Sequence, residues 1–167
     1  MHSFYRDNQT IYYKLLPIMA QSFSFDTHPL VILEDDEDDR HIYENLLREI
    51  APHLQLRFFI SGEDLLAALQ SKSLQPFLII SEVHLSGMTG MELRKKLDED
   101  QSIRTKAIPF VFFSHPIFKR ELEEAYHLTI QGFFEKSPDL AEFGRQLDSV
   151  VRYWSDCKHP NRSDIES

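Results

Sequence analysis

Polar side chains that could share one chemical task stand directly after separate apolar stretches of this sequence. Glu34 and Asp35 follow one stretch, Glu82 follows another, and Ser114 and Lys136 close two later ones. Carboxylates that lie close together repel one another, and a bound hard cation, a neighbouring lysine or protonation relieves that repulsion. If the chain brings these five side chains together, they form a suitable seat for Mg2+ and a phosphoryl group.

The pattern of apolar residues predicts the elements that would position these groups. Five short apolar runs alternate with helical patterns, at residues 30–33, 54–60, 77–80, 108–114 and 129–134. The first, third and fourth runs are continuously apolar, as central strands are, whereas the second alternates and the fifth is partly polar. We therefore expect an α/β fold with a doubly wound, five-stranded parallel sheet in the order 2-1-3-4-5 and right-handed crossovers. Ligands bind such sheets beyond the carboxyl ends of strands 1 and 3, where the polar side chains would meet.

Capping residues and prolines indicate where the helices begin. Helix starts are predicted at Asp38 or Asp39, at Ser61, at Thr89, at Pro116, and at Ser137 with Pro138. Thr89 and Glu92 have the spacing of a capping box, in which each side chain bonds to the backbone of the other residue. Gly87 and Gly90 before this helix permit sharp turns. The last helix has an apolar stripe that extends to Trp154.

Length and composition fit one domain of 167 residues. We expect that domain at 29–154, an N-terminal extension at 1–28 and a C-terminal tail at 155–167, with Met19 as an alternative translation start. The net charge of -9 argues against binding to nucleic acid. The single cysteine, Cys157, excludes an internal disulfide and favours a reducing compartment. Since no segment is long and apolar enough to cross a bilayer, we expect a cytoplasmic protein without membrane contact.

In the order and spacing of these motifs, residues 29–154 resemble the receiver domain of two-component response regulators, which has a flavodoxin-like fold. Glu34 and Asp35 match the acidic pair of that family, and the run LSGMTG at 85–90 is similar to its LPGMDG loop. The resemblance implies Mg2+ as cofactor and a histidine kinase or another signalling protein as partner. It implies the following roles: metal ligands Glu34, Asp35 and Glu82; phosphoryl-pocket residues Ser114 and Lys136; switch residues Ser114 and Phe133.

The sequence departs from the family at the phosphoacceptor position, where Glu82 replaces the usual aspartate. The extra methylene moves the carboxylate by roughly 1–1.5 Å, and a misplacement of about 1 Å can slow a reaction ~100-fold. Glu82 therefore occupies the position of the phosphoacceptor, but we do not expect it to be phosphorylated in the ordinary way. Two readings stay open: a built-in mimic of the phosphoryl group, or an inert site in a domain that signals by binding alone. The simplest alternative is that the acidic residues form a solvated loop edge with no binding role.

These observations predict a stand-alone receiver domain in two-component phosphorelay signalling that is not an enzyme and has no assigned catalytic residue. It would act through protein contacts, either as a pseudo-receiver adaptor or as a weak phosphoacceptor. The expected surface comprises helix 4, strand 5 and helix 5 of the family, roughly residues 116–154, and would serve a partner or a second copy in a homodimer. The competing function is a small Mg2+-dependent phosphatase with Asp35 or Asp36 as nucleophile.

Overall fold

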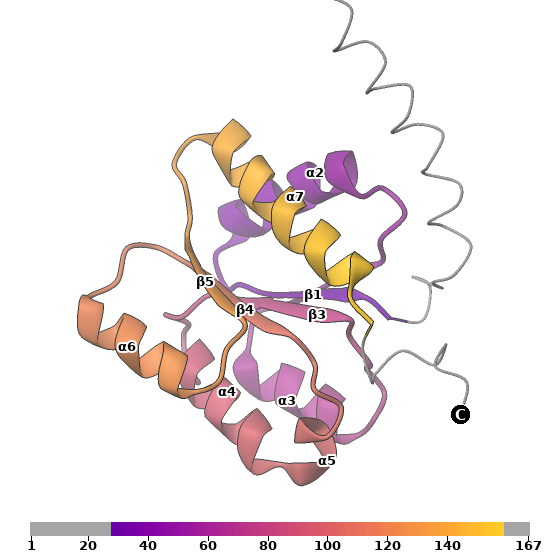
Figure 1. Ribbon diagram of the computed structural model, residues 1–167, viewed down its shortest axis with the longest axis vertical. Helices are drawn as coiled ribbons and strands as arrows, with labels where there is room; N and C mark the ends of the chain where they lie inside the picture. Colours follow the sequence, from indigo (N-terminus) through magenta and orange to yellow (C-terminus); the bar gives the residue numbers. More distant parts are fainter. Residues whose placement is uncertain (1–27, 159–167) are drawn as a thin grey trace, which may run out of the picture.

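The computed structural model describes residues 28–158, which form one parallel sheet of five strands (Figure 1). The order of the strands is β2-β1-β3-β4-β5, so the predicted doubly wound α/β fold is confirmed. The strands are β1 Leu30–Leu33, β2 Leu56–Phe59, β3 Leu78–Ser81, β4 Phe110–Ser114 and β5 Gly132–Glu135.

Helices cover both faces of this sheet. They are α2 Glu37–Ile50, α3 Gly62–Gln70, α4 Gly90–Glu99, α5 Gln101–Arg104, α6 Lys119–His127 and α7 Leu140–Asp156. In Figure 1, α2 and α7 lie on one face, and α3, α4, α5 and α6 lie on the other. The domain therefore has three layers, with the sheet in the middle.

Each face of the sheet has its own hydrophobic core because side chains alternate along a strand. Leu30 and Ile32 belong to the core beneath α2 and α7, whereas Val31 and Leu33 belong to the core beneath α3 and α4. Every residue of β1, β3 and β4 is buried, while β2 and β5 are partly exposed. This burial agrees with the prediction that the continuously apolar runs are the central strands.

The register of the sheet aligns the polar residues that follow the strands. β1 and β3 pair in parallel up to their last residues, so Glu34 and Glu82 both follow the same rung of the ladder. On the other side of β3, strands β4 and β5 pair Ser114 with Glu135. Lys136 comes next, and its backbone N–H donates to the carbonyl of Ser114 at 2.8 Å. Four strand ends thus converge on one place.

Two of the predicted helix starts are confirmed. Ser61 caps α3, and its hydroxyl accepts a hydrogen bond from the Asp64 backbone N–H at 3.2 Å. Thr89 caps α4 in the predicted capping box: its hydroxyl accepts from the Glu92 N–H at 3.1 Å, and the Glu92 carboxylate accepts from the Thr89 N–H at 2.9 Å. In both cases a side-chain oxygen satisfies a backbone donor of the first turn.

Three other helix starts differ from prediction. Asp36, not Asp38 or Asp39, caps α2, because its carboxylate accepts the Asp39 N–H at 2.9 Å. Asp139 caps α7 by accepting the Glu142 N–H at 2.8 Å, so Ser137 and Pro138 precede the helix.

Helix α6 begins at Lys119, three residues after the predicted Pro116. The residue before it, Phe118, donates its backbone N–H to the Glu121 carboxylate at 3.0 Å. The second strand is also shorter than predicted, since Leu54 and Ile60 lie outside β2, and the short helix α5 was not predicted.

The predicted extension at 1–28 lies outside the described residues except for His28, and the alternative start at Met19 lies outside them as well. Of the predicted tail, residues 159–167 also lie outside, while α7 continues through Asp156. Within residues 28–158, none of the helices has the length and apolar character that a membrane span requires.

Candidate functional site

Four of the predicted site residues lie together at the carboxyl ends of the strands. Glu34 follows β1, Glu82 follows β3, Ser114 ends β4 and Lys136 follows β5. Their side chains are buried: the exposed fraction is 2% for Glu34, 4% for Glu82 and 6% for Lys136, and Ser114 is fully buried. Because a buried charge without a partner is costly, the contacts among these groups decide what the site can do.

Both oxygens of the Glu82 carboxylate are already engaged. Oε1 accepts hydrogen bonds from the Ser114 hydroxyl and from the Val83 backbone N–H, the latter at 2.7 Å. Oε2 lies 2.9 Å from Nζ of Lys136 and 3.3 Å from Nδ1 of His115. A carboxylate offers about four acceptor positions, so this one has little capacity left for another donor.

The ammonium group of Lys136 lies at the centre of three carboxylates. Its Nζ is 2.5 Å from Glu34 Oε2, 2.8 Å from Asp39 Oδ2 and 2.9 Å from Glu82 Oε2. It also lies 5.6 Å from the centre of the Tyr43 ring, within the range of a cation–π contact. Since an ammonium has three N–H donors, three carboxylate partners satisfy it fully.

The pKa values in this cluster reflect burial and pairing together. Burial opposes ionisation of Glu82, but the charge of Lys136 and the hydrogen bond from Ser114 outweigh it and hold the pKa of Glu82 below its usual value. Burial raises the pKa of Glu34, and Lys136 offsets that effect only in part. For Lys136, burial disfavours the charge, yet Glu82, Asp39 and Glu34 raise its pKa above the usual value. The cluster is therefore built around a charged lysine.

Asp35, the other member of the predicted acidic pair, is used differently. Its Oδ2 accepts a hydrogen bond from the Ser86 backbone N–H at 2.7 Å, which ties the loop after β3 to the end of β1. Arg40 supports the same turn, because its Nη1 donates to the carbonyl oxygens of Glu34 at 3.1 Å and Asp35 at 2.7 Å. Asp35 thus holds the loop that borders the site.

Phe133, the predicted switch residue, lies in β5 opposite Phe112 of β4. The two ring centres are 5.8 Å apart, and Phe133 is only partly buried. It packs against the core beneath α3 and α4, two residues before the level of Ser114 along the paired strands.

The donor set does not fit a divalent cation as it is arranged. Among residues 28–158, no group of three or more His, Cys, Asp or Glu side chains is placed to hold a metal ion. Of the three predicted ligands, Glu34 and Glu82 bind the Lys136 ammonium, and Asp35 binds a backbone amide. A cation among the carboxylates would have to displace the lysine. We therefore assign no metal to the site in this arrangement.

Asp39 is the site residue that sequence reasoning missed. It was weighed only as a helix cap, whereas its carboxylate binds Lys136. With Asp36 as the cap, Asp39 falls in the first turn of α2, and side chains on a helix lean toward its N-terminus. The N-terminus of α2 lies near the strand ends, so a side chain in its first turn can reach the site. The sequence contained one sign of this: Asp39 follows Asp36 by three residues, which is the spacing between a helix cap and the first turn.

Comparisons with known proteins agree with this architecture. A family model described as the response regulator receiver domain matches residues 30–148. No curated protein matches the chain.

Several solved structures have the same fold. The phosphorylated cyanobacterial phytochrome response regulator RcpA is 19% identical, with 80% of this chain and 99% of that chain covered and a TM-score of 0.72. A response regulator receiver domain from Rhodospirillum rubrum is 20% identical, with 80% and 98% covered and a TM-score of 0.68. The Mn2+-bound form of response regulator Rcp1 is 18% identical, with 78% and 96% covered and a TM-score of 0.69. At such identities the likeness concerns the fold.

Proposed function

Because the chain belongs to the response regulator receiver domain family of two-component signalling, we propose that it is a receiver whose signalling state does not depend on phosphorylation. One observation carries this proposal: the Glu82 carboxylate already binds Ser114 and Lys136, the two residues that the family resemblance assigns to a phosphoryl group. The Glu82 carboxylate thus takes up the contacts that a phosphoryl group would otherwise make with Ser114 and Lys136.

Of the two readings of Glu82, the contacts favour the built-in mimic. The longer side chain extends its carboxylate as far as the Lys136 ammonium and the Ser114 hydroxyl, and the Glu82 side chain as a whole is 4% exposed. It brings about one negative charge, against the -1.5 to -2 of a phosphoryl group, and fewer acceptor oxygens. We therefore infer a fixed and partial imitation of the phosphorylated state, with little room for a real phosphoryl group.

The domain is proposed to be non-enzymatic. A phosphatase would need a strand-1 carboxylate free to attack phosphorus. Asp36 uses its side chain to cap α2, and Asp35 uses its side chain to bind the Ser86 N–H. Neither arrangement favours a nucleophile, so we do not propose the phosphatase.

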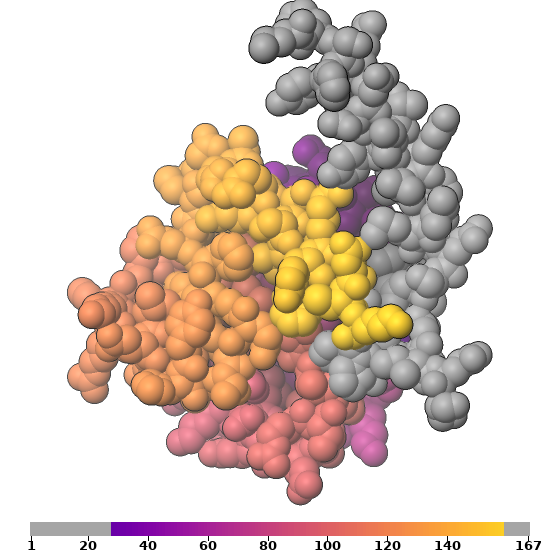
Figure 2. All heavy atoms as spheres, viewed as in Figure 1, coloured from indigo at the N-terminus to yellow at the C-terminus, as the bar shows by residue number. Residues whose placement is uncertain are grey.

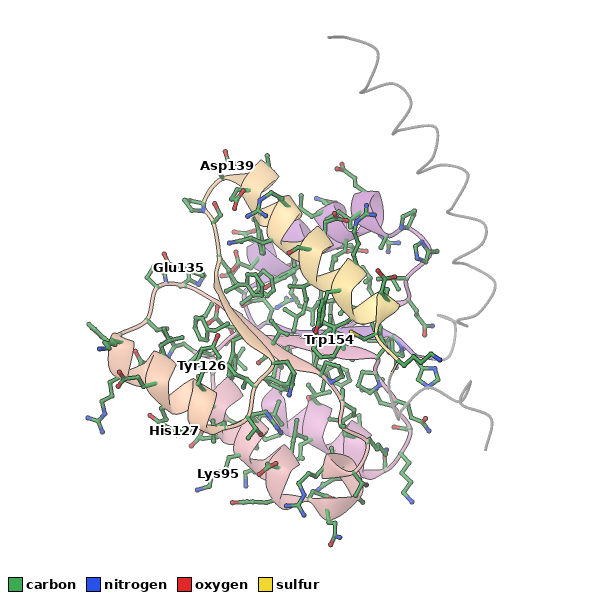
Figure 3. All side chains as sticks on the ribbon, viewed as in Figure 1. Lys95, Tyr126, His127, Glu135, Asp139 and Trp154 are labelled. Atoms are coloured by element: carbon green, nitrogen blue, oxygen red, sulfur yellow. The ribbon has the colours of Figure 1, made fainter. Side chains whose placement is uncertain are left out.

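The proposed output is a protein contact made by α6, β5 and α7. In Figure 2 this orange and yellow part of the chain covers much of the visible face. Four large apolar side chains on or beside these helices are exposed: Phe118 by 81%, Tyr126 by 55%, Leu140 by 54% and Tyr153 by 62%. Figure 3 labels Tyr126 on α6 and Trp154 on α7. Aromatic side chains are enriched in protein interfaces.

The proposed partner is a histidine kinase or another signalling protein in the cytoplasm, with a second copy of the chain as the alternative.

Amide NMR spectra test whether this surface responds to phosphorylation. We expect acetyl phosphate with Mg2+ to leave the native spectrum unchanged, because Glu82 already occupies the pocket. In Glu82→Asp the shorter side chain releases Ser114 and Lys136, and the same additions should shift amides of β4, α6 and β5. Glu82→Gln, which has the native length without the charge, is the matched control. Phosphate-dependent shifts across α6 and α7 of the native protein would contradict the proposal.

A further inference from the structure

An apolar groove lies between the edge strand β5 and the last turns of α7. Val111 of β4 and Val150 of α7 are buried beneath it, and Phe134, Tyr153 and Trp154 also line it. Its volume is about 420 Å3. In Figure 3, Trp154 lies at the opposite end of α7 from Asp139, the residue that caps this helix. The groove is therefore remote from the carboxylate cluster.

The groove offers aromatic surface that another segment can reach. Tyr153 is 62% exposed, and Phe134 and Trp154 are partly exposed. Neighbouring rings hold these side chains in place. Phe134 stacks on the buried Phe113 with ring centres 4.7 Å apart, and Tyr153 and Trp154 meet edge to face at 5.1 Å. Such a fixed and accessible aromatic surface favours an apolar or aromatic occupant.

The N-terminal part of the sequence has a composition that matches this groove. Six of residues 1–27 are aromatic, against 12% of the whole chain. The stretch 11–18, IYYKLLPI, carries a single charge, at Lys14. Residues 159–167, by contrast, contain no aromatic residue and one large aliphatic residue, Ile165. Solvated tails are poor in aromatic residues, so the composition of residues 1–27 predicts that they pack against a surface.

The same stretch is within reach of the groove. His28 directly precedes Pro29 and β1, and all five strands are parallel, so β1 begins at the same edge of the sheet as β4 and β5. Gln131, just before β5, lines the groove at this edge. Three strand spacings separate β1 from β5, or about 15 Å. Residues 19–27 can span up to about 30 Å, which is enough to bring the stretch 11–18 to the groove.

We propose that residues 11–18 of this chain dock in the groove between β5 and α7. Their apolar side chains would cover the accessible faces of Phe134, Tyr153 and Trp154. A tethered segment has an effective concentration on the order of mM, which favours it over a separate molecule. The groove borders the contact surface proposed above, so the docked stretch would compete there with a partner. This consequence rests on the proposed function, whereas the docking itself does not.

Fluorescence of the full chain tests the proposal, because Trp154 is its single tryptophan and lines the groove. We expect Leu15→Asp combined with Leu16→Asp to release the stretch, since aspartate resists burial. Trp154 should then emit at longer wavelength and be quenched more strongly by acrylamide than in the native chain. Ile165→Asp introduces the same charge in the other terminal segment and should leave Trp154 unchanged.

Amide NMR of the full chain tests the contact from the side of the groove. Ser149 is exposed and lines the groove, so Ser149→Arg places a long charged side chain in it. We expect this variant to shift the amides of residues 11–18, although they are far from Ser149 in the sequence. Ala141→Arg is the matched control, because Ala141 is exposed on α7 outside the groove. It should leave those amides unchanged.

Three results would overturn the proposal. The first is unchanged Trp154 quenching in the variant with Leu15→Asp and Leu16→Asp. The second is an equal response of residues 11–18 to Ser149→Arg and Ala141→Arg, which would indicate an effect of charge alone. The third is protection of Trp154 that increases with protein concentration, which would assign the groove to a second copy of the chain.

Discussion

At the scale of single residues, Lys136 determines the character of the candidate site. Its ammonium is within 2.9 Å of three carboxylates: Glu34 directly after β1, Asp39 in α2 and Glu82 directly after β3. Without it, buried acidic groups would face one another with no counter-charge. A protein with a net charge of -9 can keep Glu34 and Glu82 buried because one lysine binds both of them, together with the partly exposed Asp39.

We expect Lys136→Met to lower the free energy of unfolding by about 3–5 kcal/mol, because removing one partner leaves buried charges unpaired. Urea unfolding would measure the change. Lys119→Met is the matched control, since Lys119 is 88% exposed and its 3.6 Å pair with Glu123 lies at the surface. A surface pair contributes about 1 kcal/mol or less. Equal losses in the two variants would show that Lys136 is not the counter-charge of the cluster.

The lowered pKa of Glu82 predicts how stability depends on pH. The unfolded side chain binds a proton near pH 4.5, and the folded one only at lower pH. Its contribution to stability is therefore complete above about pH 4.5 and is lost as the pH falls through the lower folded pKa. We expect the unfolding free energy of the native protein to fall more steeply between about pH 5 and pH 3 than that of Glu82→Gln. Parallel urea-unfolding profiles for the two proteins would contradict this assignment.

Most of the site residues could be predicted because each follows an apolar run, and parallel strands place their carboxyl ends at one edge. Glu34, Glu82, Ser114 and Lys136 meet for this reason. Asp39, the third carboxylate partner of Lys136, could not be predicted in the same way. Asp39 joins the cluster only because α2 begins after Asp36, and an error of two residues in the helix start changes which side chain faces the strands.

At the scale of elements, α4 begins unusually close to the site. The Gly90 N–H donates at 2.9 Å to the carbonyl of Val83, the residue next to Glu82 in the loop that follows β3. A Cβ at Gly90 would lie 2.2 Å from the Glu82 carbonyl oxygen and 2.8 Å from the Phe112 ring. The sequence suggested a sharp turn at Gly87 and Gly90. Gly87 does have a φ of 81°, but Gly90 is needed for this close approach.

Gly90→Ala should therefore lower the free energy of unfolding by roughly 1–3 kcal/mol, because α4 must move away from β3. Gly144→Ala in α7 is a useful comparison, since the new Cβ would meet Leu46 at an ordinary 3.4 Å. Alanine in a helix interior gains up to about 1 kcal/mol over glycine, so that variant should be neutral or stabilised. Urea unfolding of both variants measures the contrast. A Gly90→Ala protein as stable as the native one would rule out the tight contact.

The starts of helices could be predicted where a side chain caps the helix through a common local motif. Ser61 and Thr89 are of this kind. Prediction was wrong where proline suggested a start, at Pro116 and Pro138, because both residues lie in the segments before the helices. Proline is compatible with the first helical turn and also with loops, so the residue alone does not separate the two.

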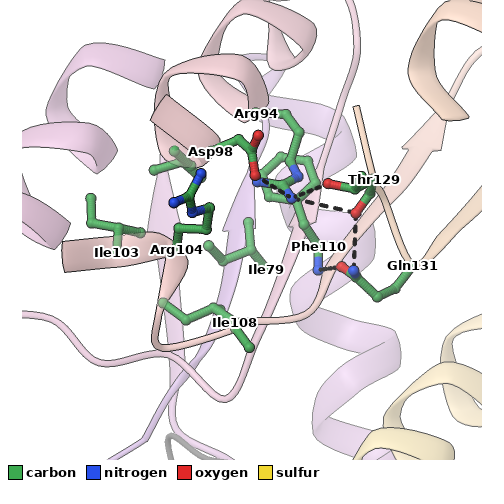
Figure 4. A pocket seen from close by; sticks show the side chains of 11 residues that line it. Ile79, Arg94, Asp98, Ile103, Arg104, Ile108, Phe110, Thr129 and Gln131 are labelled. Carbon is green, nitrogen blue, oxygen red and sulfur yellow. Dashed lines mark hydrogen bonds and ion pairs between the residues drawn. The ribbon is translucent and has the colours of Figure 1, made fainter. Parts of the chain in front are cut away.

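At the scale of the whole molecule, β3 and β4 connect two polar features of opposite charge. The buried carboxylates and Lys136 lie at the carboxyl ends, and a cavity lined by Arg94 and Arg104 lies at the amino ends (Figure 4). The cavity could not be predicted from the sequence, because its rim depends on positive φ values at Ala107 and Thr129. Neither residue type signals that conformation.

The central claim is that Glu82 occupies the pocket in place of a phosphoryl group. The most direct test is the intact-protein mass after incubation with acetyl phosphate and Mg2+, measured for the native protein and Glu82→Asp side by side. We expect the native mass to stay unchanged and the variant to gain one phosphoryl group. A phosphoryl group on the native protein, mapped to Glu82, would contradict the account.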